Sequence, residues 1–385
     1  AMQEEFGWSE TTKGLVLSSF FLGYLLFQIP SGWLANRFGG RWVMGAAIVW
    51  WSLCTVATPF AALLSLPTLF VVRVAMGLGE AATFPAAYYL GARWSPPAER
   101  SRFVAIVLSG IPIGTLFALL TTGEIVARWG WPAAFYSFGV VGLVLSIVWF
   151  WVVRDAPAQH PWISSGEREL LARSDEKSDA ARRTPWGDIV RQPAVWALVF
   201  NHFCSNWTLY VLLSWLPSYF RRTQDLSLVD AGLFSAAPWL SMFAMVNIGA
   251  WAADTLISRG VGVTLVRKLF QIAGLLGAAC FLSLTRDASS AAAALVLMCL
   301  ALGALGLTWA GFAPNHLDIA PRYGDVLMGF TNTAGTIPGV IGVAVTGWLI
   351  DRTGSYDAPF MLAAGVSIAG ALVWALFATG RRIIE

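Results

Sequence analysis

The stretch from Leu66 to Leu90, LPTLFVVRVAMGLGEAATFPAAYYL, is apolar and long enough to cross a bilayer as a helix, yet it contains Arg73 and Glu80. The two residues are two helical turns apart, so both project from one face with about 10 Å between them. A charge near the bilayer centre costs about 2.5 to 17 kcal/mol, and membrane helices keep one where it faces a polar interior. The segment therefore predicts one wall of a polar pathway through a membrane. The alternative is an Arg–Glu pair that only joins two helices.

The composition of the whole chain agrees with a membrane location. Hydrophobic residues make up 57% and charged residues 12%, and the mean hydropathy is +0.65, which predicts an all-α polytopic membrane protein. The net charge of +3 is spread over short loops, so we expect no nucleic-acid partner. The four cysteines lie in apolar segments without metal-ligand spacing, and no phosphate-binding loop or nucleophile with its base is present. We therefore expect no metal, no cofactor and no enzymatic activity.

Apolar stretches separated by short polar breaks predict eleven membrane spans. They cover approximately residues 14–35, 42–64, 66–90, 103–123, 131–153, 195–219, 229–252, 265–285, 291–315, 325–350 and 358–379. The long polar segment after the fifth span predicts an N-terminal helical half at 1–153, a linker at 154–194 and a C-terminal helical half at 195–385. Most Arg and Lys residues of the breaks fall on the side of the linker, which places that side in the cytoplasm, or in the equivalent compartment if the membrane is that of an organelle.

An internal repeat explains the odd number of spans. The pattern from Ser9 to Leu15 recurs from Ser227 to Leu233, and the pattern from Trp33 to Asn36 recurs from Trp251 to Asp254, both with an offset of 218 (227 − 9 and 254 − 36). In the second half a full span precedes the repeated loop, and its counterpart in the first half falls before residue 1. We therefore expect a parent of two six-helix halves, typical of secondary transporters, with the first helix of the N-terminal half missing from this chain.

The loop after the first span reads GWLANRFGGR over residues 32–41 and resembles the G-x-x-x-D-R-x-G-G-R signature of the major facilitator superfamily. Its glycines permit a tight turn, and its arginines can pair with carboxylates or helix C-termini across the gap between the halves. The resemblance implies a cytoplasmic gate made by Gly32, Asn36, Arg37, Gly40 and Arg41. Asn36 stands where the signature has Asp, so one charge of this gate is missing. The alternative is a loop whose charges only set the topology.

The stretch from Arg73 to Ala86 resembles the fourth-helix motif of the anion:cation symporter branch of that superfamily. This branch includes vesicular glutamate transporters, sialin, bacterial sugar-acid symporters and plastid phosphate and ascorbate carriers. The resemblance places Arg73 in the substrate region and makes Glu80 the ion-coupling carboxylate. A carboxylate in an apolar setting can change protonation near neutral pH, and Arg73 holds the ionised form until an anion competes for its charge. Pro85 is expected to loosen the helix next to Glu80.

Further stretches extend the resemblance over nearly the whole chain. Residues 202–210 are similar to the seventh helix of the family, 315–323 to the end of the tenth and 332–336 to the eleventh. Residues 237–240 and 250–255 are most similar to the plastid phosphate-carrier branch. Members of that branch carry phosphate, ascorbate or carboxylates, so the substrate stays open among these anions.

Polar residues within the spans complete the candidate site. Tyr24 and Gln28 are one turn apart, and Tyr24 aligns with a family position near the substrate; hydroxyl and amide groups suit a carboxylate or phosphate. Together with Arg73, the substrate-binding candidates are Tyr24, Asn206, Trp207, Tyr210 and Asn332, although polar residues also join membrane helices to one another. We expect structural or rim positions for His202 and His316, with pH sensing as the alternative. Asp318 and Arg322 are expected to pair at a loop end.

These observations predict a monomeric, multi-pass protein with the major facilitator fold, in a plasma or organelle membrane that includes the plastid's among the candidates. The expected function is secondary active transport of a small anion, either inorganic phosphate or an organic carboxylate, by symport with H⁺ or Na⁺. An uncoupled anion facilitator and a transport-incompetent sensor or scaffold are the alternatives.

Overall fold

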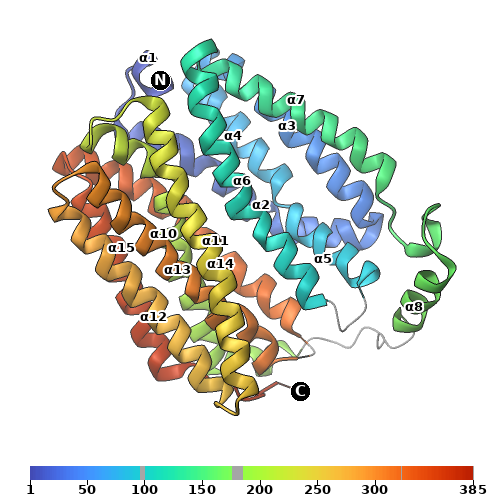
Figure 1. Ribbon diagram of the computed structural model, residues 1–385. Helices are drawn as coiled ribbons and strands as arrows, with labels where there is room; N and C mark the ends of the chain where they lie inside the picture. The colour runs from blue at the N-terminus through green and yellow to red at the C-terminus, as the bar shows by residue number, and fades with distance from the viewer. Residues whose placement is uncertain (96–99, 176–184, 322, 385) are drawn as a thin grey trace. The chain divides into compact units, whose positions relative to one another are not determined.

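The computed structural model describes residues 1–95, 100–175, 185–321 and 323–384, and the regular elements in these ranges are all helices (Figure 1). The helices before the linker are α1 (Met2–Glu5), α2 (Glu10–Phe38), α3 (Gly40–Leu64), α4 (Leu66–Glu80), α5 (Thr83–Trp94), α6 (Arg100–Trp129) and α7 (Trp131–Val152). The linker region contains η1 (Pro157–Gln159), α8 (Ser165–Asp175) and α9 (Trp186–Arg191). The remaining helices are α10 (Pro193–Thr223), α11 (Leu228–Ser258), α12 (Val263–Leu284), η2 (Thr285–Asp287), α13 (Ala291–Ile319), α14 (Gly324–Thr353) and α15 (Asp357–Phe377).

Within the described ranges, ten helical segments are long and apolar enough to cross a membrane, and they correspond to ten of the eleven predicted spans. The prediction is wrong for residues 195–219. They do form a long helix, α10, but its composition is less apolar than that of the ten helices that qualify as membrane spans. The reason is its buried polar face, which includes Asn201, His202, Ser205 and Thr208. Burial against other helices, rather than lipid, accommodates these side chains.

Contacts divide the chain into two compact units. The C-terminal unit comprises Ala1–Ser18, Pro112–Arg128 and Thr184–Glu385, and the N-terminal unit comprises Ser19–Ile111 and Trp129–Arg183. Helices α2 and α6 therefore each contribute one end to the C-terminal unit and the rest to the N-terminal unit.

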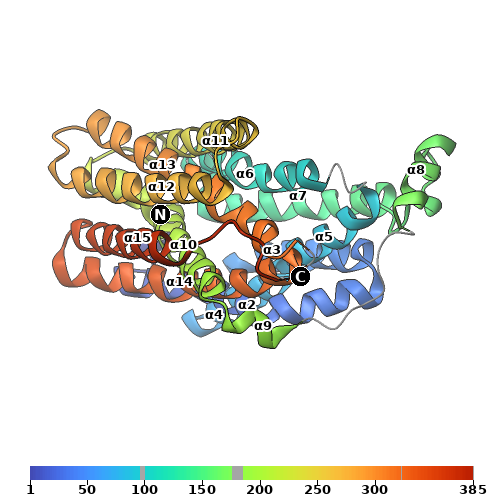
Figure 2. The ribbon, with the colours of Figure 1, turned by 90° about the horizontal axis from the view of Figure 1, so that it is seen from below.

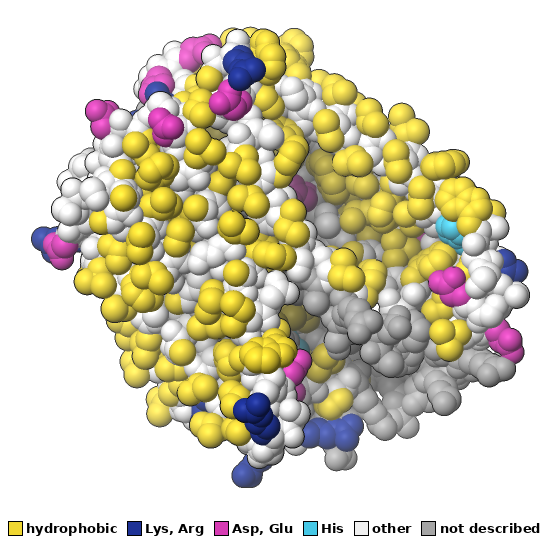
Figure 3. Space-filling model, in the orientation of Figure 1, with side chains coloured by type: hydrophobic (Ala, Val, Ile, Leu, Met, Phe, Trp, Pro, Cys, Tyr) yellow, Lys and Arg dark blue, Asp and Glu magenta, His cyan; other side chains and the backbone are white. Residues whose placement is uncertain are grey.

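In the C-terminal unit, α10 packs against α14 and α15, while α13 packs against α11 and α12 (Figure 2). Its interior is filled by large side chains that are fully buried, among them Trp215, Trp239, Trp374 and Phe360. The face of this unit seen in Figure 3 is mostly hydrophobic, and its charged side chains lie toward the helix ends. Such a surface fits a bilayer, where the apolar faces meet lipid and the charges reach the interfaces.

In the N-terminal unit, α3 packs against α7 on one side and α4 on the other (Figure 1). Small residues bring α3 and α7 close together: a Cβ atom at Gly45 would lie 2.2 Å from the Phe150 ring, and one at Gly139 would lie 3.0 Å from the Ser52 carbonyl oxygen. Without a strong hydrophobic force between helices in lipid, such close packing is what holds membrane helices together.

The repeat seen in the sequence has a structural counterpart. The Ser9 hydroxyl accepts a hydrogen bond from the Thr12 backbone N–H at 3.1 Å, and the Ser227 hydroxyl accepts one from the Asp230 N–H at 3.1 Å, so each serine caps the start of its helix. A Cβ atom at Gly14 would lie 3.0 Å from a carbonyl oxygen of α14, and one at Gly232 would lie 2.9 Å from a carbonyl oxygen of α6. Positions related by the repeat therefore have the same roles in α2 and α11: the serines cap the helices and the glycines allow a neighbouring helix to approach closely.

Candidate functional site

The candidate site is built on a close crossing of α2 and α4. A Cβ atom at Gly77 would lie 2.0 Å from the Phe20 carbonyl oxygen, and one at Gly23 would lie 2.0 Å from the Val74 carbonyl oxygen. The two backbones are thus in direct contact, which only glycine permits at both positions. Since Arg73 and Glu80 lie about one turn on either side of Gly77, this crossing sets both charged residues beside α2.

Arg73 has no counter-ion in the described part of the chain. Its guanidinium carbon lies 5.4 Å from the centroid of the Phe20 ring, Nη1 lies 3.7 Å from the Met76 sulfur, and the buried Nε has no hydrogen-bond partner. No ion pair within 4.0 Å joins Arg73 to Glu80 or to another described carboxylate. A cation–π contact is worth about 0.5 to 2 kcal/mol, less than the cost of a charge in the bilayer. The guanidinium is therefore held in place without being neutralised.

Glu80 ends α4 because the helix breaks directly after it. Pro85 has no N–H to bond to the Ala81 carbonyl, and its ring clashes with that carbonyl in a continuous helix. The chain accordingly turns at residues 81–82 before α5 begins at Thr83. The Ser31 hydroxyl of α2 lies 3.1 Å from the freed Ala81 oxygen and 2.8 Å from the Gln28 carbonyl oxygen, and it donates to both. The expected loosening next to Glu80 is thus a short interruption at residues 81–82, which keep right-handed helical backbone angles, and it is stabilised from a neighbouring helix.

Polar atoms without partners surround this break. Gln28 is only 7% exposed, and its Oε1 has no hydrogen-bond partner among the described residues; the same holds for the buried Oγ1 of Thr83. Tyr24 is half-buried, and its ring centroid lies 6.2 Å from that of Phe20. Buried polar groups are normally satisfied, so unmet hydrogen-bonding capacity on α2, α4 and α5 marks this region as a place for a ligand or water. Sequence reasoning missed Phe20 and Thr83, which carry no signal of their own.

The residues of the expected cytoplasmic gate divide into two groups. Arg41 is tied into the N-terminal unit: its backbone N–H donates to Asp155 at 2.8 Å, and its guanidinium Nη2 donates to the Phe150 carbonyl at 2.7 Å, near the C-terminus of α7. Gly39 has φ of +89°, and a Cβ there would lie 2.6 Å from the Asp155 carboxylate oxygens. Asp155, which sequence reasoning missed, therefore caps the N-terminus of α3.

Asn36 and Arg37 are exposed and make only local contacts among the described residues. The Asn36 side-chain amide donates to the Gly32 carbonyl at 3.1 Å, and the Arg37 guanidinium carbon lies 5.8 Å from the centroid of the Trp33 ring. Pairing of these residues across the two halves stays a prediction.

The candidates in the C-terminal unit lie on α10 and α14. The Asn206 side-chain amide donates to the Gly335 carbonyl at 2.8 Å, which joins the two helices. Trp207 is buried against Gly342, and its indole N–H has no partner among the described residues. Asn332 and Tyr210 are half-buried. The structure therefore brings Asn206 and Asn332 to the same stretch of the α10–α14 contact.

Asp318 pairs with a different arginine from the one expected. Its carboxylate binds Arg267 of α12 in a bidentate pair with distances of 2.7 and 3.3 Å, and Arg267 Nη1 also donates to the Ala310 carbonyl at 3.1 Å. The expected partner, Arg322, lies outside the described residues. Proximity in sequence misled the prediction, because α12 and α13 pack along their lengths and bring Arg267 within reach.

A cluster of charged residues holds the start of α2 in the C-terminal unit. Glu10 is buried and pairs with Arg222 of α10, and its carboxylate lies 3.4 Å from Lys13 Nζ. The Asp351 carboxylate of α14 accepts hydrogen bonds from the backbone N–H groups of Glu10 at 3.0 Å and Thr11 at 2.7 Å. A carboxylate at a helix N-terminus stabilises that end of the helix, so α2 is anchored to α14 and α10 here.

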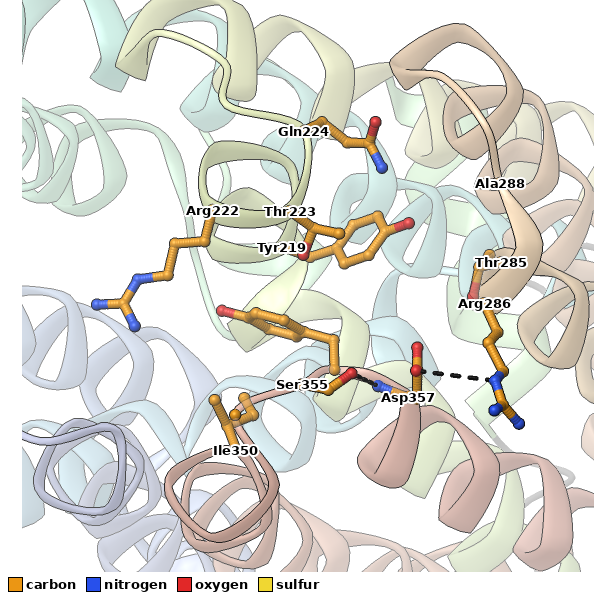
Figure 4. A pocket seen from close by; sticks show the side chains of 12 residues that line it. Tyr219, Arg222, Thr223, Gln224, Thr285, Arg286, Ala288, Ile350, Ser355 and Asp357 are labelled. Atoms are coloured by element: carbon orange, nitrogen blue, oxygen red, sulfur yellow. Dashed lines mark hydrogen bonds and ion pairs between the residues drawn. The ribbon is translucent and has the colours of Figure 1, made fainter.

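A cavity of about 280 Å³ lies at the same end of the C-terminal unit (Figure 4). It is lined by the end of α10, the η2 turn and the α14–α15 connection, and Arg286 Nε lies 4.0 Å from the Asp357 carboxylate at its edge. The buried hydroxyls of Tyr219 and Tyr356 have no hydrogen-bond partner among the described residues, and burial raises the pKa of Tyr356, so this hydroxyl stays a neutral donor. None of the substrate-binding candidates lines this cavity.

Comparisons with known proteins identify the family and agree with the fold. The family model described as Major Facilitator Superfamily matches residues 1–343. The chain is 42% identical over 384 residues to the chloroplastic ascorbate transporter of Arabidopsis thaliana, covering 100% of this chain and 71% of that protein. It is 41% identical to the chloroplastic sodium-dependent phosphate transport protein 1 of the same plant, covering 100% and 75%, and 36% identical to sialin of Homo sapiens, covering 98% and 77%.

Solved structures with the same fold include a D-xylose-proton symporter, with a TM-score of 0.74 and 17% identity over 98% of this chain and 92% of that one. A bacterial homologue of the human lysosomal transporter Spinster, in an inward-facing and unoccupied conformation, has a TM-score of 0.72 and 17% identity over 98% and 89%. At this level of identity the likeness shows the fold alone.

Proposed function

Because the chain belongs to the Major Facilitator Superfamily, and within it to the anion:cation symporter family, we propose that it is a secondary active transporter of a small anion coupled to a cation gradient. The chain is a multi-pass integral membrane protein of a family of transporters rather than enzymes. Its relatives are named for phosphate, for ascorbate and for glutamate, which is a carboxylate, and the proposed substrate class is inorganic phosphate or an organic carboxylate. The protein acts as a monomer, with H⁺ or Na⁺ as the coupling ion and no other cofactor.

The observation that carries this proposal is the uncompensated charge of Arg73. A membrane protein can offset a buried arginine with a directly bound carboxylate, but among the described residues the direct contacts of Arg73 are with an aromatic ring and a thioether, and Glu80 acts on it only from beyond 4.0 Å. The missing negative charge is supplied by the transported anion. A guanidinium offers a planar set of donors that match the oxygens of a carboxylate or phosphate, and Tyr24 and Gln28 on α2 add neutral hydrogen-bonding groups.

Glu80 gives the coupling. It lies on the same helix as Arg73 and ends that helix, where the carbonyl groups of the last turn repel a carboxylate charge. Binding a proton relieves this repulsion, and occupation of Arg73 by an anion removes the positive charge that favours ionised Glu80. Anion and proton therefore bind together more readily than either binds alone. In the C-terminal unit, Asn206, Tyr210 and Asn332 complete the substrate site in this proposal, and Trp207 supports it by packing on α14.

Alternating access requires a gate at each end of the pathway. On the side away from the linker, the contacts of Glu10 with Arg222 and of Asp351 with the start of α2 hold α2 to the C-terminal unit. These contacts lie within the C-terminal unit, which includes residues 1–18. At the cytoplasmic side the gate is the loop from Gly32 to Arg41.

The test is uptake into liposomes that contain the purified protein, with labelled phosphate, ascorbate and a panel of small carboxylates under separately imposed proton and sodium gradients. Accumulation of one anion that follows one gradient is the expected result. Arg73→Ala should weaken apparent affinity by about 10- to 100-fold, the worth of charge-assisted hydrogen bonds. Glu80→Gln should keep anion exchange and lose accumulation driven by the gradient. Arg128→Ala, which removes an exposed arginine paired with Glu124 at 3.1 Å, is the matched control and should behave as the unchanged protein.

Other outcomes identify the alternatives. Uptake that equilibrates without following either gradient, and that Glu80→Gln leaves unaffected, indicates an uncoupled facilitator. Absence of exchange for every anion in a folded, reconstituted protein contradicts transport and favours a sensor or scaffold.

A further inference from the structure

Two buried histidines in the C-terminal unit are joined by one threonine hydroxyl. Thr331 Oγ1 of α14 lies 3.1 Å from His202 Nδ1 of α10 and 2.8 Å from His316 Nε2 of α13. All three residues are buried: Thr331 is 0% exposed, His316 is 1% exposed and His202 is 5% exposed, so His202 is the least enclosed end of this row. The three residues come from three different helices, and the substrate-binding candidates Asn206 and Asn332 lie on two of them.

The hydrogen-bond partners fix where the protons are. His316 Nδ1 lies 2.9 Å from the Ala313 carbonyl oxygen, which can only accept, so Nδ1 carries the hydrogen and Nε2 of the neutral ring is an acceptor. The Thr331 hydroxyl therefore donates to His316 Nε2. Its oxygen accepts from His202 Nδ1, which must carry the hydrogen of that ring. Nε2 of neutral His202 is then a bare acceptor, and no described residue hydrogen-bonds to it.

The hydrogen-bonded row of His202, Thr331 and His316 can take up one proton without losing a hydrogen bond. A proton added at His202 Nε2 makes that ring an imidazolium, whose Nδ1 hydrogen moves to Thr331 Oγ1 as the threonine's own hydrogen moves to His316 Nε2. His202 is neutral again with its hydrogen on Nε2, the Thr331 hydroxyl now donates to His202 Nδ1, and the charge resides on His316, which donates from both nitrogens. The Met328 carbonyl, 3.2 Å from Thr331 Oγ1, is a second acceptor for the hydroxyl during the exchange.

The charges around the chain leave room for this proton. On α12 and α13, Arg267 and Asp318 neutralise each other, and Asp318 interacts electrostatically with His316. Lys268 of α12 directs its ammonium group to the Ala375 carbonyl of α15 at 2.7 Å. The thiol of Cys204 on α10 is a further titratable group of this helix, and it packs against Gly370 of α15. No described carboxylate pairs directly with either histidine.

We propose that His202, Thr331 and His316 form a proton-binding site of the C-terminal unit, which takes up its proton at His202 and stores the charge on His316. Proton uptake changes the accessible face of His202 from an acceptor into an N–H donor and adds a positive charge behind it, so it favours the binding of an anion. This proposal rests on the proposed anion transport and gives it a coupling site separate from Glu80.

The test begins with a measurement that does not need transport. The chain has three histidines, His160, His202 and His316, so ¹⁵N-histidine solid-state NMR of the reconstituted protein gives few enough signals to assign with single His→Gln variants. At high pH the signals of His202 and His316 should both show hydrogen on Nδ1. As the pH is lowered, one proton should enter and the His202 signal should change to hydrogen on Nε2. Because burial disfavours an imidazolium, this should occur below the pH at which a free imidazole changes charge.

The matched variants are Thr331→Val and Thr346→Val, two buried threonines of α14, of which Thr346 donates only to the Gly342 carbonyl of its own helix. Thr331→Val should abolish the change of the His316 signal with pH and reduce proton-driven phosphate accumulation by about tenfold. Thr331→Ser should restore both. Thr346→Val should not alter the histidine signals. Hydrogen on Nε2 of both rings at high pH, or equal behaviour of the two valine variants, would overturn the proposal. Phosphate exchange by the unchanged protein, measured without a gradient, reports separately on the proposed transport.

Discussion

Substitution of Gly77 by alanine tests whether the contact between α2 and α4 builds the site. The added Cβ would lie 2.0 Å from the Phe20 carbonyl oxygen and 2.8 Å from the Tyr24 backbone nitrogen, whereas ordinary contact begins at 3.4 Å. The helices must therefore separate by about 1.4 Å (3.4 − 2.0), because both obstacles are backbone atoms that cannot rotate away. Overpacking of this kind costs up to about 3 kcal/mol, and the better helix propensity of alanine offsets about 1 kcal/mol. The expected net destabilisation is about 2 kcal/mol.

The matched control is Gly365→Ala on α15, where no atom lies within 4 Å of the added Cβ. Only the propensity effect applies there, so this variant should gain up to about 1 kcal/mol. Equilibrium unfolding by SDS in mixed micelles measures both changes. Anion uptake should fall at least about tenfold in Gly77→Ala, because separation of the helices moves Arg73 away from α2, and should be retained in Gly365→Ala. Equal stability and equal uptake of the two variants would refute the reasoning that this crossing positions the site.

Two further changes probe what supports the site. Ser31→Ala should destabilise the protein by about 1 kcal/mol in SDS unfolding, because the Ala81 carbonyl loses its hydrogen-bond donor. In a Pro85→Ala background the effect should be much smaller, because the backbone N–H of residue 85 can then bond to this carbonyl. An equal loss of stability in both backgrounds would contradict this account. Asp155→Ala should cost about 1 kcal/mol by uncapping α3 and raise hydrogen exchange at the Arg41 amide, and unchanged exchange there would argue against the cap.

The sequence was sufficient for the family, the all-α fold and the helix that carries the charges, because all three depend on local signals. Apolar length predicts a span, seven-residue spacing puts Arg73 and Glu80 on one face, and a proline four residues after Ala81 predicts a disturbed helix. The family model and ten of the eleven predicted spans confirm the fold. The exception is α10, for which an apolar span was predicted. This helix carries several polar side chains that are buried inside the bundle, which makes it less apolar than the other spans.

The rest of the site could not be predicted because it depends on contacts between distant segments. The hydroxyl that stabilises the helix break comes from Ser31, fifty residues before Ala81, and the link between His202 and Thr331 spans 129 residues. Spacing on one helix gives the face of a residue but not its partner on another helix. For the same reason the sequence predicted Arg322 as the ion-pair partner of Asp318, whereas the packing of α12 on α13 places Arg267 next to this carboxylate.

A comparison of two arginines in membrane helices, Arg73 and Arg267, explains why only Arg73 is proposed to bind substrate. Arg267 meets both oxygens of Asp318 and a backbone carbonyl, so its charge is neutralised by the protein itself. Arg73 also lies in a membrane helix, yet among the described residues its direct contacts are with Phe20 and Met76, and Glu80 acts on it only from beyond 4.0 Å. An arginine that serves structure has its counter-charge built in, and removal of that partner would leave a costly buried ion. An arginine that must bind and release an anion cannot have one, because a permanent carboxylate would compete with every substrate. The absence of a described counter-ion at Arg73 is therefore the feature that transport requires, and the close α2–α4 crossing is what keeps this unneutralised charge in position.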